Sequence, residues 1–125
     1  MMRNALFVGA GGALGAVLRS SISLWIPVSM PIPTLLANIV GSFLLGYATI
    51  LVQKEKLSPE RMLLLGTGFC GGLTTISTFS METVHLWQQF APYAYLYIIL
   101  TGLMGLGAAL FGMKIARGKW SGADR

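Results

Sequence analysis

The sequence predicts an all-α membrane protein with four transmembrane helices, the third of which is broken in mid-membrane. Three observations lead to this prediction. Of the 125 residues, 54% are hydrophobic and 10% are charged, whereas about 25% are charged in ordinary soluble domains. Four segments stay apolar over roughly the 20 residues that a helix needs to cross a bilayer. The third segment is too long for one crossing and carries paired glycines near its centre.

The expected spans cover residues 4–26, 34–52, 62–90 and 93–113, within a single domain over residues 1–125. The first span contains one charge, and we expect it to stay uncleaved because Gly11 and Gly15 have a helix-packing spacing. Three prolines lie in the connection 27–33. Ser58 is expected to cap the third segment, with Pro59 at its first helical position. A break at Ala91-Pro92 separates the last two spans.

Basic residues concentrate on one side of this topology. With four spans, the two chain ends and the loop 53–60 share a side, and the other side has only Arg19 near it. The shared side holds Arg3, Lys54, Lys56, Arg61, Lys114, Arg117, Lys119 and Arg125. Because cytoplasmic loops are rich in Lys and Arg, the termini are predicted to be cytoplasmic. These flanks account for the net charge of +5, so a nucleic-acid partner is not expected.

The third segment is predicted to be two half-helices. Residues 62–90 would make a single helix about 43 Å long, well over the hydrocarbon thickness of about 30 Å. The break is placed near 71–75, where two glycines and two threonines disfavour a helix. Carbonyl groups freed by such a break can bind a cation. A tilted helix with a glycine kink fits the pattern equally well.

A row of hydroxyl groups follows the proposed break. Its members are Thr74, Thr75, Ser77, Thr78 and Ser80. A lipid-facing helix does not favour such a row, so it predicts a polar track through the membrane. The structural alternative is that these side chains bond back to their own helix or across to a neighbour.

Four further polar residues lie within the expected spans. Asn38 needs partners for its amide, and interhelical bonding explains it as well as a functional role does. Glu82 is an intramembrane carboxylate and therefore a functional candidate, although it can equally accept hydrogen bonds from nearby hydroxyls. Arg19 is expected to extend to the membrane interface, and His85 to lie near the outer end of the third span.

The sequence contains no enzyme signature, so the protein is not expected to be an enzyme. Paired carboxylates, metal-ligand clusters and a nucleophile with a histidine partner are all missing from the sequence. The glycines near residue 11 do not form a dinucleotide fingerprint, because no acidic residue follows at the required distance.

Three motifs resemble the CrcB/Fluc family of fluoride channels, and the resemblance covers nearly the whole chain. The longest is the run from Gly68 to Glu82, GFCGGLTTISTFSME. The second is Gly11-Gly12-x-x-Gly15-x-x-x-Arg19 in the first span. The third is Thr34-Leu35-x-x-Asn38-x-x-Gly41-Ser42-Phe43 in the second span.

The resemblance implies a fluoride-selective channel of the bacterial inner membrane that exports fluoride from the cytoplasm by passive electrodiffusion and confers fluoride resistance. It implies an antiparallel dimer with two pores along its interface, embedded in lipid. A structural Na⁺ ion would lie at that interface on the backbone carbonyls of Gly71 and Thr74. Arg19 matches a conserved arginine of the family. The pore positions would be Asn38, Ile76, Ser77, Phe79, Ser80 and Glu82.

Two departures leave alternatives open. Ile76 stands where the family usually has phenylalanine, and isoleucine offers no positive ring edge to an anion. The charge distribution of eight to one favours a single orientation, whereas an antiparallel homodimer needs dual topology. The chain is therefore either one subunit of a homodimer or one subunit of a heterodimer with a homologous chain. In the heterodimer it could also be the subunit that does not conduct. A four-span ion-coupled multidrug-type transporter is the remaining alternative.

Overall fold

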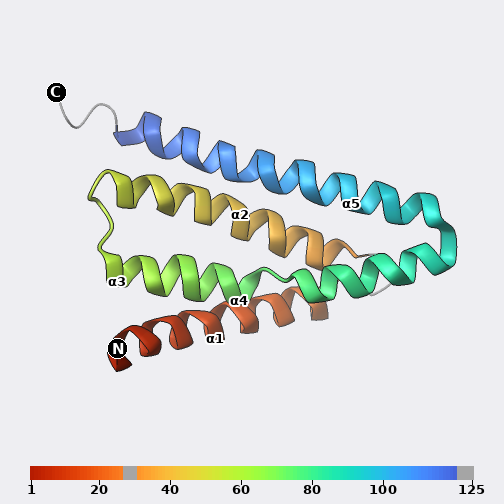
Figure 1. The fold of residues 1–125 in the computed structure, drawn as a ribbon, viewed down its shortest axis with the longest axis horizontal. Coiled ribbons are helices and arrows are strands. Elements are labelled where there is room, and N and C mark those ends of the chain that lie inside the picture. The colour runs from red at the N-terminus through yellow and green to blue at the C-terminus, as the bar shows by residue number, and fades with distance from the viewer. Residues whose placement is uncertain (27–30, 121–125) are drawn as a thin grey trace.

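A computed structural model describes residues 1–26 and 31–120 and shows a bundle of long helices (Figure 1). The all-α prediction is confirmed, and residues 1–26 and 31–120 contain no strand. The elements are α1 (Met2–Trp25), α2 (Ile32–Gln53), α3 (Pro59–Met62), the π-helix η1 (Leu63–Cys70), α4 (Gly71–Leu73) and α5 (Ile76–Trp120). Residues 27–30 of the predicted proline connection, Arg125 and the side chain of Trp120 lie outside the described part.

The third helical run begins as the sequence predicts and then departs from it. The Ser58 hydroxyl accepts a hydrogen bond from the Arg61 backbone N–H at 3.3 Å, with Pro59 in the first turn. The run then continues as a π-helix over η1, which the residue pattern does not signal. π-helical turns occur mainly as short insertions and are frequent at functional sites.

This run is interrupted at Thr74 and Thr75. α4 ends at Leu73, Thr74 is extended (φ −81°, ψ 153°), and α5 begins at Ile76. The interruption is narrower than the sequence suggested for 71–75, because Gly71 and Gly72 are still helical. The Thr74 N–H makes the last helical bond of this half, 2.9 Å to the Cys70 carbonyl.

α5 consists of two rods joined at Phe90, where the backbone is non-helical (φ −162°, ψ 103°). Figure 1 shows the chain doubling back at this point. We call residues 76–89 proximal α5 and residues 91–120 distal α5. The bend precedes the expected Ala91-Pro92 break by one residue, and Pro92 falls in the first turn of distal α5, where its missing N–H costs little. Distal α5 extends to Trp120 instead of ending near 113.

Glycines let the helices approach until their backbones touch. A Cβ added at Gly11 would overlap the Leu64 carbonyl, and one added at Gly15 would lie 2.7 Å from the Leu73 nitrogen. α1 therefore packs directly against η1 and α4. Distal α5 packs on α2 in the same way, because a Cβ at Gly46 would overlap the Ala109 carbonyl. α2 lies between distal α5 and the interrupted run (Figure 1).

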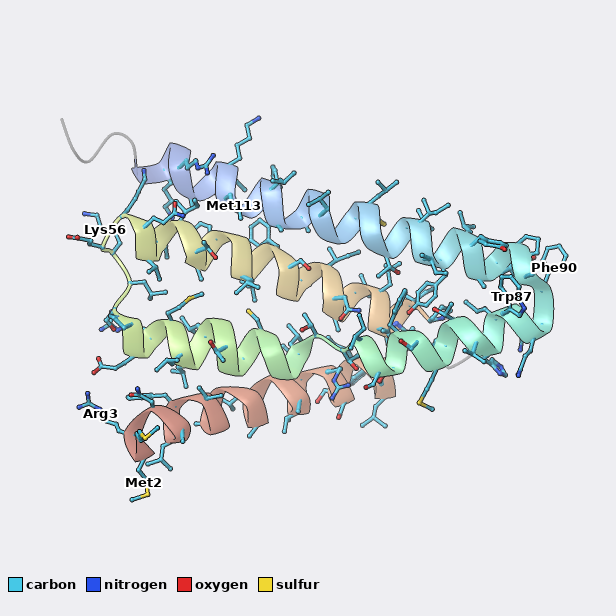
Figure 2. All side chains as sticks on the ribbon, viewed as in Figure 1. Met2, Arg3, Lys56, Trp87, Phe90 and Met113 are labelled. Atoms are coloured by element: carbon cyan, nitrogen blue, oxygen red, sulfur yellow. The ribbon has the colours of Figure 1, made fainter. Side chains whose placement is uncertain are left out.

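Three helical stretches are long and apolar enough to cross a membrane: Met2–Trp25, Ile32–Gln53 and Pro59–Lys119. The third stretch has 61 residues and includes both the interruption and the bend. Arg3 and Lys56 lie at one end of the bundle, and Trp87 and Phe90 lie at the other (Figure 2). At the basic end, Arg3 pairs with Glu60 at 2.7 Å.

Candidate functional site

Asn38 of α2 holds the interruption open. Its Oδ1 accepts from the Thr75 backbone N–H at 2.9 Å, and its Nδ2 donates to the Thr75 carbonyl at 3.3 Å. Both polar atoms of the amide are therefore committed to one residue of the neighbouring chain segment. The side chain replaces the helical bonds that Thr75 would otherwise make.

The same arrangement releases two carbonyl groups. In a continuous helix, the N–H groups of Thr75 and Thr78 would donate to the carbonyls of Gly71 and Thr74, four residues earlier. The Thr75 N–H donates to Asn38 instead, and the Thr78 N–H donates to the Thr75 hydroxyl at 3.2 Å. Carbonyl oxygen is a ligand that hard cations accept. The chemistry of Gly71 and Thr74 thus fits the cation that the sequence resemblance implies.

Glu82 is bonded by hydroxyls from two neighbouring helices. Its Oε1 accepts from the Thr34 hydroxyl of α2 at 2.8 Å, and its Oε2 accepts from the Tyr97 hydroxyl of distal α5 at 2.7 Å. Thr34 and Tyr97 are both buried. We call these three residues the Glu82 cluster. Glu82 accepts hydrogen bonds from hydroxyls, as the structural alternative describes, and the cluster ties α2 to both rods of α5.

Phe79 and Ile76 line the same groove but differ in their surroundings. The Phe79 ring is half-buried and packs against the Tyr97 ring, with centroids 5.1 Å apart and planes inclined by 45°. Ile76 is 80% exposed. Phe79 thereby connects the Glu82 cluster to the groove, whereas Ile76 stands at its open side.

The hydroxyl row is only partly free. Ser80 donates to the Ile76 carbonyl at 2.8 Å, and the Ser77 and Thr75 hydroxyls lie 3.2 Å apart. Ser77 and Ser80 are both exposed. Their bonds follow the structural alternative of side chains satisfied by their own chain, while their oxygens keep lone pairs available to another donor.

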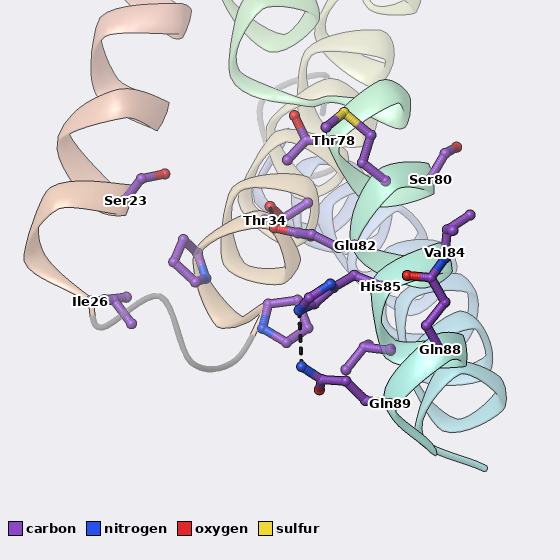
Figure 3. A pocket seen from close by; sticks show the side chains of 14 residues that line it. Ser23, Ile26, Thr34, Thr78, Ser80, Glu82, Val84, His85, Gln88 and Gln89 are labelled. Carbon is purple, nitrogen blue, oxygen red and sulfur yellow. Dashed lines mark hydrogen bonds between the residues drawn. The ribbon is translucent and has the colours of Figure 1, made fainter. Parts of the chain in front are cut away.

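The candidate residues divide between two neighbouring hollows. The inner groove has a volume of about 930 Å³ and is lined in part by Asn38, Gly71, Thr74, Ile76 and Phe79. The outer pocket, of about 820 Å³, is lined in part by Thr34, Ser80, Glu82 and His85 (Figure 3). Phe79 and Glu82 are one turn apart on proximal α5, so the two hollows follow one another along this helix. Ser77 and Arg19 line neither hollow.

Sequence reasoning did not identify three residues of this region. It missed Thr34 as a hydrogen-bond donor to Glu82, and it did not single out Tyr97 or Thr101 at all. The Thr101 hydroxyl oxygen is buried with no hydrogen-bond partner among the described residues, and Thr101 lines the inner groove. Tyr97 and Thr101 are four residues apart and therefore share a helix face. This spacing of two hydroxyl side chains in an apolar segment is the sequence signal that could have identified them. The Nε of Arg19 is likewise buried and unpartnered among the described residues.

Comparison with known proteins finds one matching family and several similar named proteins. The family described as "CrcB-like protein, Camphor Resistance (CrcB)" matches residues 6–113. The chain is 42% identical over 123 residues to the "Fluoride-specific ion channel FluC" of Methanopyrus kandleri, covering 96% of this chain and 94% of that protein. It is 44% identical over 115 residues to "Fluoride-specific ion channel FluC 2" of Bacillus subtilis (91% and 86% covered).

A third relative, "Fluoride-specific ion channel FluC" of Shewanella amazonensis, is 47% identical over 119 residues, covering 91% of this chain and 96% of that protein. The matched segment includes the interruption, the residues of the Glu82 cluster and the residues that line both hollows. With these relatives and the family match over residues 6–113, the chain belongs to the CrcB-like family.

Proposed function

We propose that this protein is a fluoride-selective ion channel that exports fluoride from the bacterial cytoplasm across the inner membrane by passive electrodiffusion. The observation that carries the proposal is a chain of contacts in an otherwise apolar helix bundle: Phe79 lines the inner groove and packs on Tyr97, which bonds Glu82 in the wall of the outer pocket. The relatives named fluoride-specific ion channels support the choice of ion. The proposal assigns transport and not catalysis.

The chemistry of fluoride explains the residue types. The ion is small and strongly hydrated, so a pathway has to replace the hydrogen bonds of water. The Thr101 hydroxyl, which has no hydrogen-bond partner among the described residues, can donate, and the Phe79 ring presents a positive edge. Several weak sites let the ion leave as readily as it binds. Glu82 then acts as an acceptor that fixes the Thr34 and Tyr97 hydroxyls.

We place four membrane crossings in this fold: α1, α2, the interrupted run from Pro59 to residue 89, and distal α5. The interruption at Thr74 and Thr75 then lies within the membrane, where non-helical backbone needs protein around it. The inner groove is open on one side, where Ile76 and Gly71 are exposed. A second subunit in antiparallel orientation would cover this side and close the pathway between the two chains.

A structural Na⁺ ion would be held by the carbonyl oxygens of Gly71 and Thr74 at this dimer interface. The support is that both carbonyls have lost their helical donors to Asn38 and to the Thr75 hydroxyl. The ion would supply a fixed positive charge that links the interrupted helices of the two subunits.

The partner subunit is either a second copy or a homologue. The eight-to-one distribution of basic residues supports a cytoplasmic location of the termini and a single orientation. A single orientation in turn favours a paired homologue that inserts the opposite way. Ile76, which lacks a ring edge, favours a chain that conducts less well than its partner or does not conduct.

Fluoride efflux from liposomes tests the function. Purified protein is reconstituted with internal fluoride, and efflux is followed with a fluoride electrode with and without a potassium ionophore. Efflux that requires the ionophore supports an electrogenic channel, and Phe79→Leu is expected to reduce it sharply. Efflux that appears only with a co-expressed homologue supports the paired-subunit form. An absence of fluoride flux in both preparations contradicts the channel function.

A further inference from the structure

His85 lies in the outer pocket, three residues beyond Glu82 on proximal α5, and its side chain is exposed. The opposite walls of the pocket include Thr34 of α2 and Ser23 of α1 (Figure 3). Imidazole is the side chain that changes charge between about pH 5 and pH 8. The position therefore puts a switchable positive charge beside the proposed outer end of the ion pathway.

The surroundings of His85 contain little other charge. Glu82 is the charged residue of the pocket wall, and both of its oxygens accept hydroxyl hydrogen bonds. Pro31, Pro33 and Thr34 form the wall at the start of α2, and Ser23 and Ile26 form it at the end of α1; none of them titrates. Distal α5 faces this region with the Tyr97 hydroxyl, which bonds Glu82. Arg19 lies one turn before Ser23 on α1 and is not part of the wall.

Gln89 allows the ring to change charge without losing its partner. The Nε2 atoms of Gln89 and His85 lie 2.9 Å apart (Figure 3). In the neutral ring, the amide N–H donates to an unprotonated Nε2. In the imidazolium both ring nitrogens are donors, and a rotated amide accepts with its oxygen instead. The contact thus suits both states of the ring.

We propose that protonated His85 is a fluoride-binding site at the outer mouth of the pathway, an inference that rests on the channel function proposed above. A positive charge at a mouth raises the local anion concentration and the rate of capture. Coulomb attraction over several ångströms in a water-like medium corresponds to a gain in flux of about two- to fivefold. The site exists only while the ring carries its second proton.

Fluoride flux at two pH values tests the site directly. Liposome efflux is measured near pH 5.5 and pH 7.5, with the leak of protein-free vesicles subtracted at each pH. The native protein is expected to conduct about threefold faster at the lower pH, and added inert salt should reduce this difference. His85→Gln should give equal flux at both values, and His85→Lys should give the higher flux at both. Gln89→Ala, which removes only the ring partner, should keep the pH response.

A binding measurement complements the flux. The chain has one histidine, so the imidazole signals in an NMR titration are unambiguous. Because fluoride would bind only the protonated ring, the midpoint of the titration should be higher in fluoride than in gluconate at equal ionic strength. An unchanged midpoint, or a pH response retained in His85→Gln, overturns the site. Flux without any pH response overturns this inference alone, whereas an absence of protein-dependent flux overturns the channel function and this inference with it.

Discussion

Single residues set the chemistry of the inner groove. Ile76 and Phe79 stand one helical turn apart on its wall, and only Phe79 has a polarised ring edge. Phe79 is held by Tyr97, whereas most of the Ile76 surface is exposed. A larger side chain at position 76 would therefore meet little resistance from within the subunit.

Ile76→Phe is expected to raise the fluoride flux about two- to fivefold. The added ring edge contributes roughly 0.5–1 kcal/mol of anion stabilisation, which corresponds to this change in rate. Liposome efflux is the measurement. Leu103→Phe is the control, because Leu103 is also an exposed apolar residue but lies on distal α5. It should leave the flux unchanged. Equal flux in Ile76→Phe and the native protein would show that position 76 does not contact the ion.

Asn38→Leu is expected to destabilise the protein by about 1 kcal/mol, the cost of losing a hydrogen bond to a partly buried backbone N–H group. The group concerned is the Thr75 N–H, which loses its acceptor. Thermal unfolding of the purified protein in detergent measures the change. Asn4→Leu is the control, because it makes the same substitution at an exposed asparagine of α1 that does not bond Thr75. Equal unfolding temperatures for the two variants would contradict the role assigned to Asn38.

At the scale of elements, glycine contacts position the interrupted run. Gly11 and Gly15 of α1 lie against the backbone of η1 and α4. In the other direction, a Cβ added at Gly72 of α4 would overlap the Gly12 carbonyl of α1. These helices are so close that there is no room between them for an added methyl group. The interruption thus receives its position from α1 on one side and from Asn38 of α2 on the other.

Gly15→Ala is expected to destabilise the fold by about 2 kcal/mol, the typical cost of overpacking a close contact. Its Cβ would overlap the Phe69 carbonyl. Gly9→Ala is a matched control on the same helix, because nothing lies within 4 Å of the Cβ that it adds. Denaturation in detergent should separate the two variants clearly. Similar stability of the two would mean that α1 can shift away at no cost.

The sequence predicted the helical class and the Ser58 cap, because composition and local capping chemistry decide both. It did not predict the π-helix or the narrow interruption. Gly71 and Gly72 stay helical, and the chain leaves the helix at Thr74 because α2 supplies Asn38 in place of a helical partner. The Glu82 cluster joins residues 34, 82 and 97, and no local pattern encodes such distant pairings.

At the scale of the whole molecule, the bundle is electrically polarised along its length. Basic side chains such as Arg3 and Lys56 stand at one end, and aromatic ones such as Trp87 and Phe90 at the other (Figure 2). Two contacts reinforce the basic end: the Arg3–Glu60 ion pair, and a 3.2 Å bond from the Lys54 amine to the Arg117 carbonyl. The end that carries the charge resists transfer across a membrane.

Tagged termini are expected to be accessible only from the cytoplasmic side. The measurement is the labelling of a tag at either end in intact cells and in permeabilised cells. Moving basic residues to the opposite end of the bundle should produce a second, inverted population. Equal populations in the native protein would contradict a fixed orientation and support a homodimer of dual topology.

The hydrogen bonds of Asn38 predict how residues 59–89 behave in the absence of α2. The helix break is imposed by a neighbour, because the amide of α2 takes the Thr75 N–H that could otherwise return to Gly71. A synthetic peptide of residues 59–89 in micelles should therefore heal into one continuous helix. Backbone chemical shifts at Thr74 and Thr75 would report it. An interruption that persists at Thr74 and Thr75 in the peptide would instead show that the local sequence breaks the helix without α2.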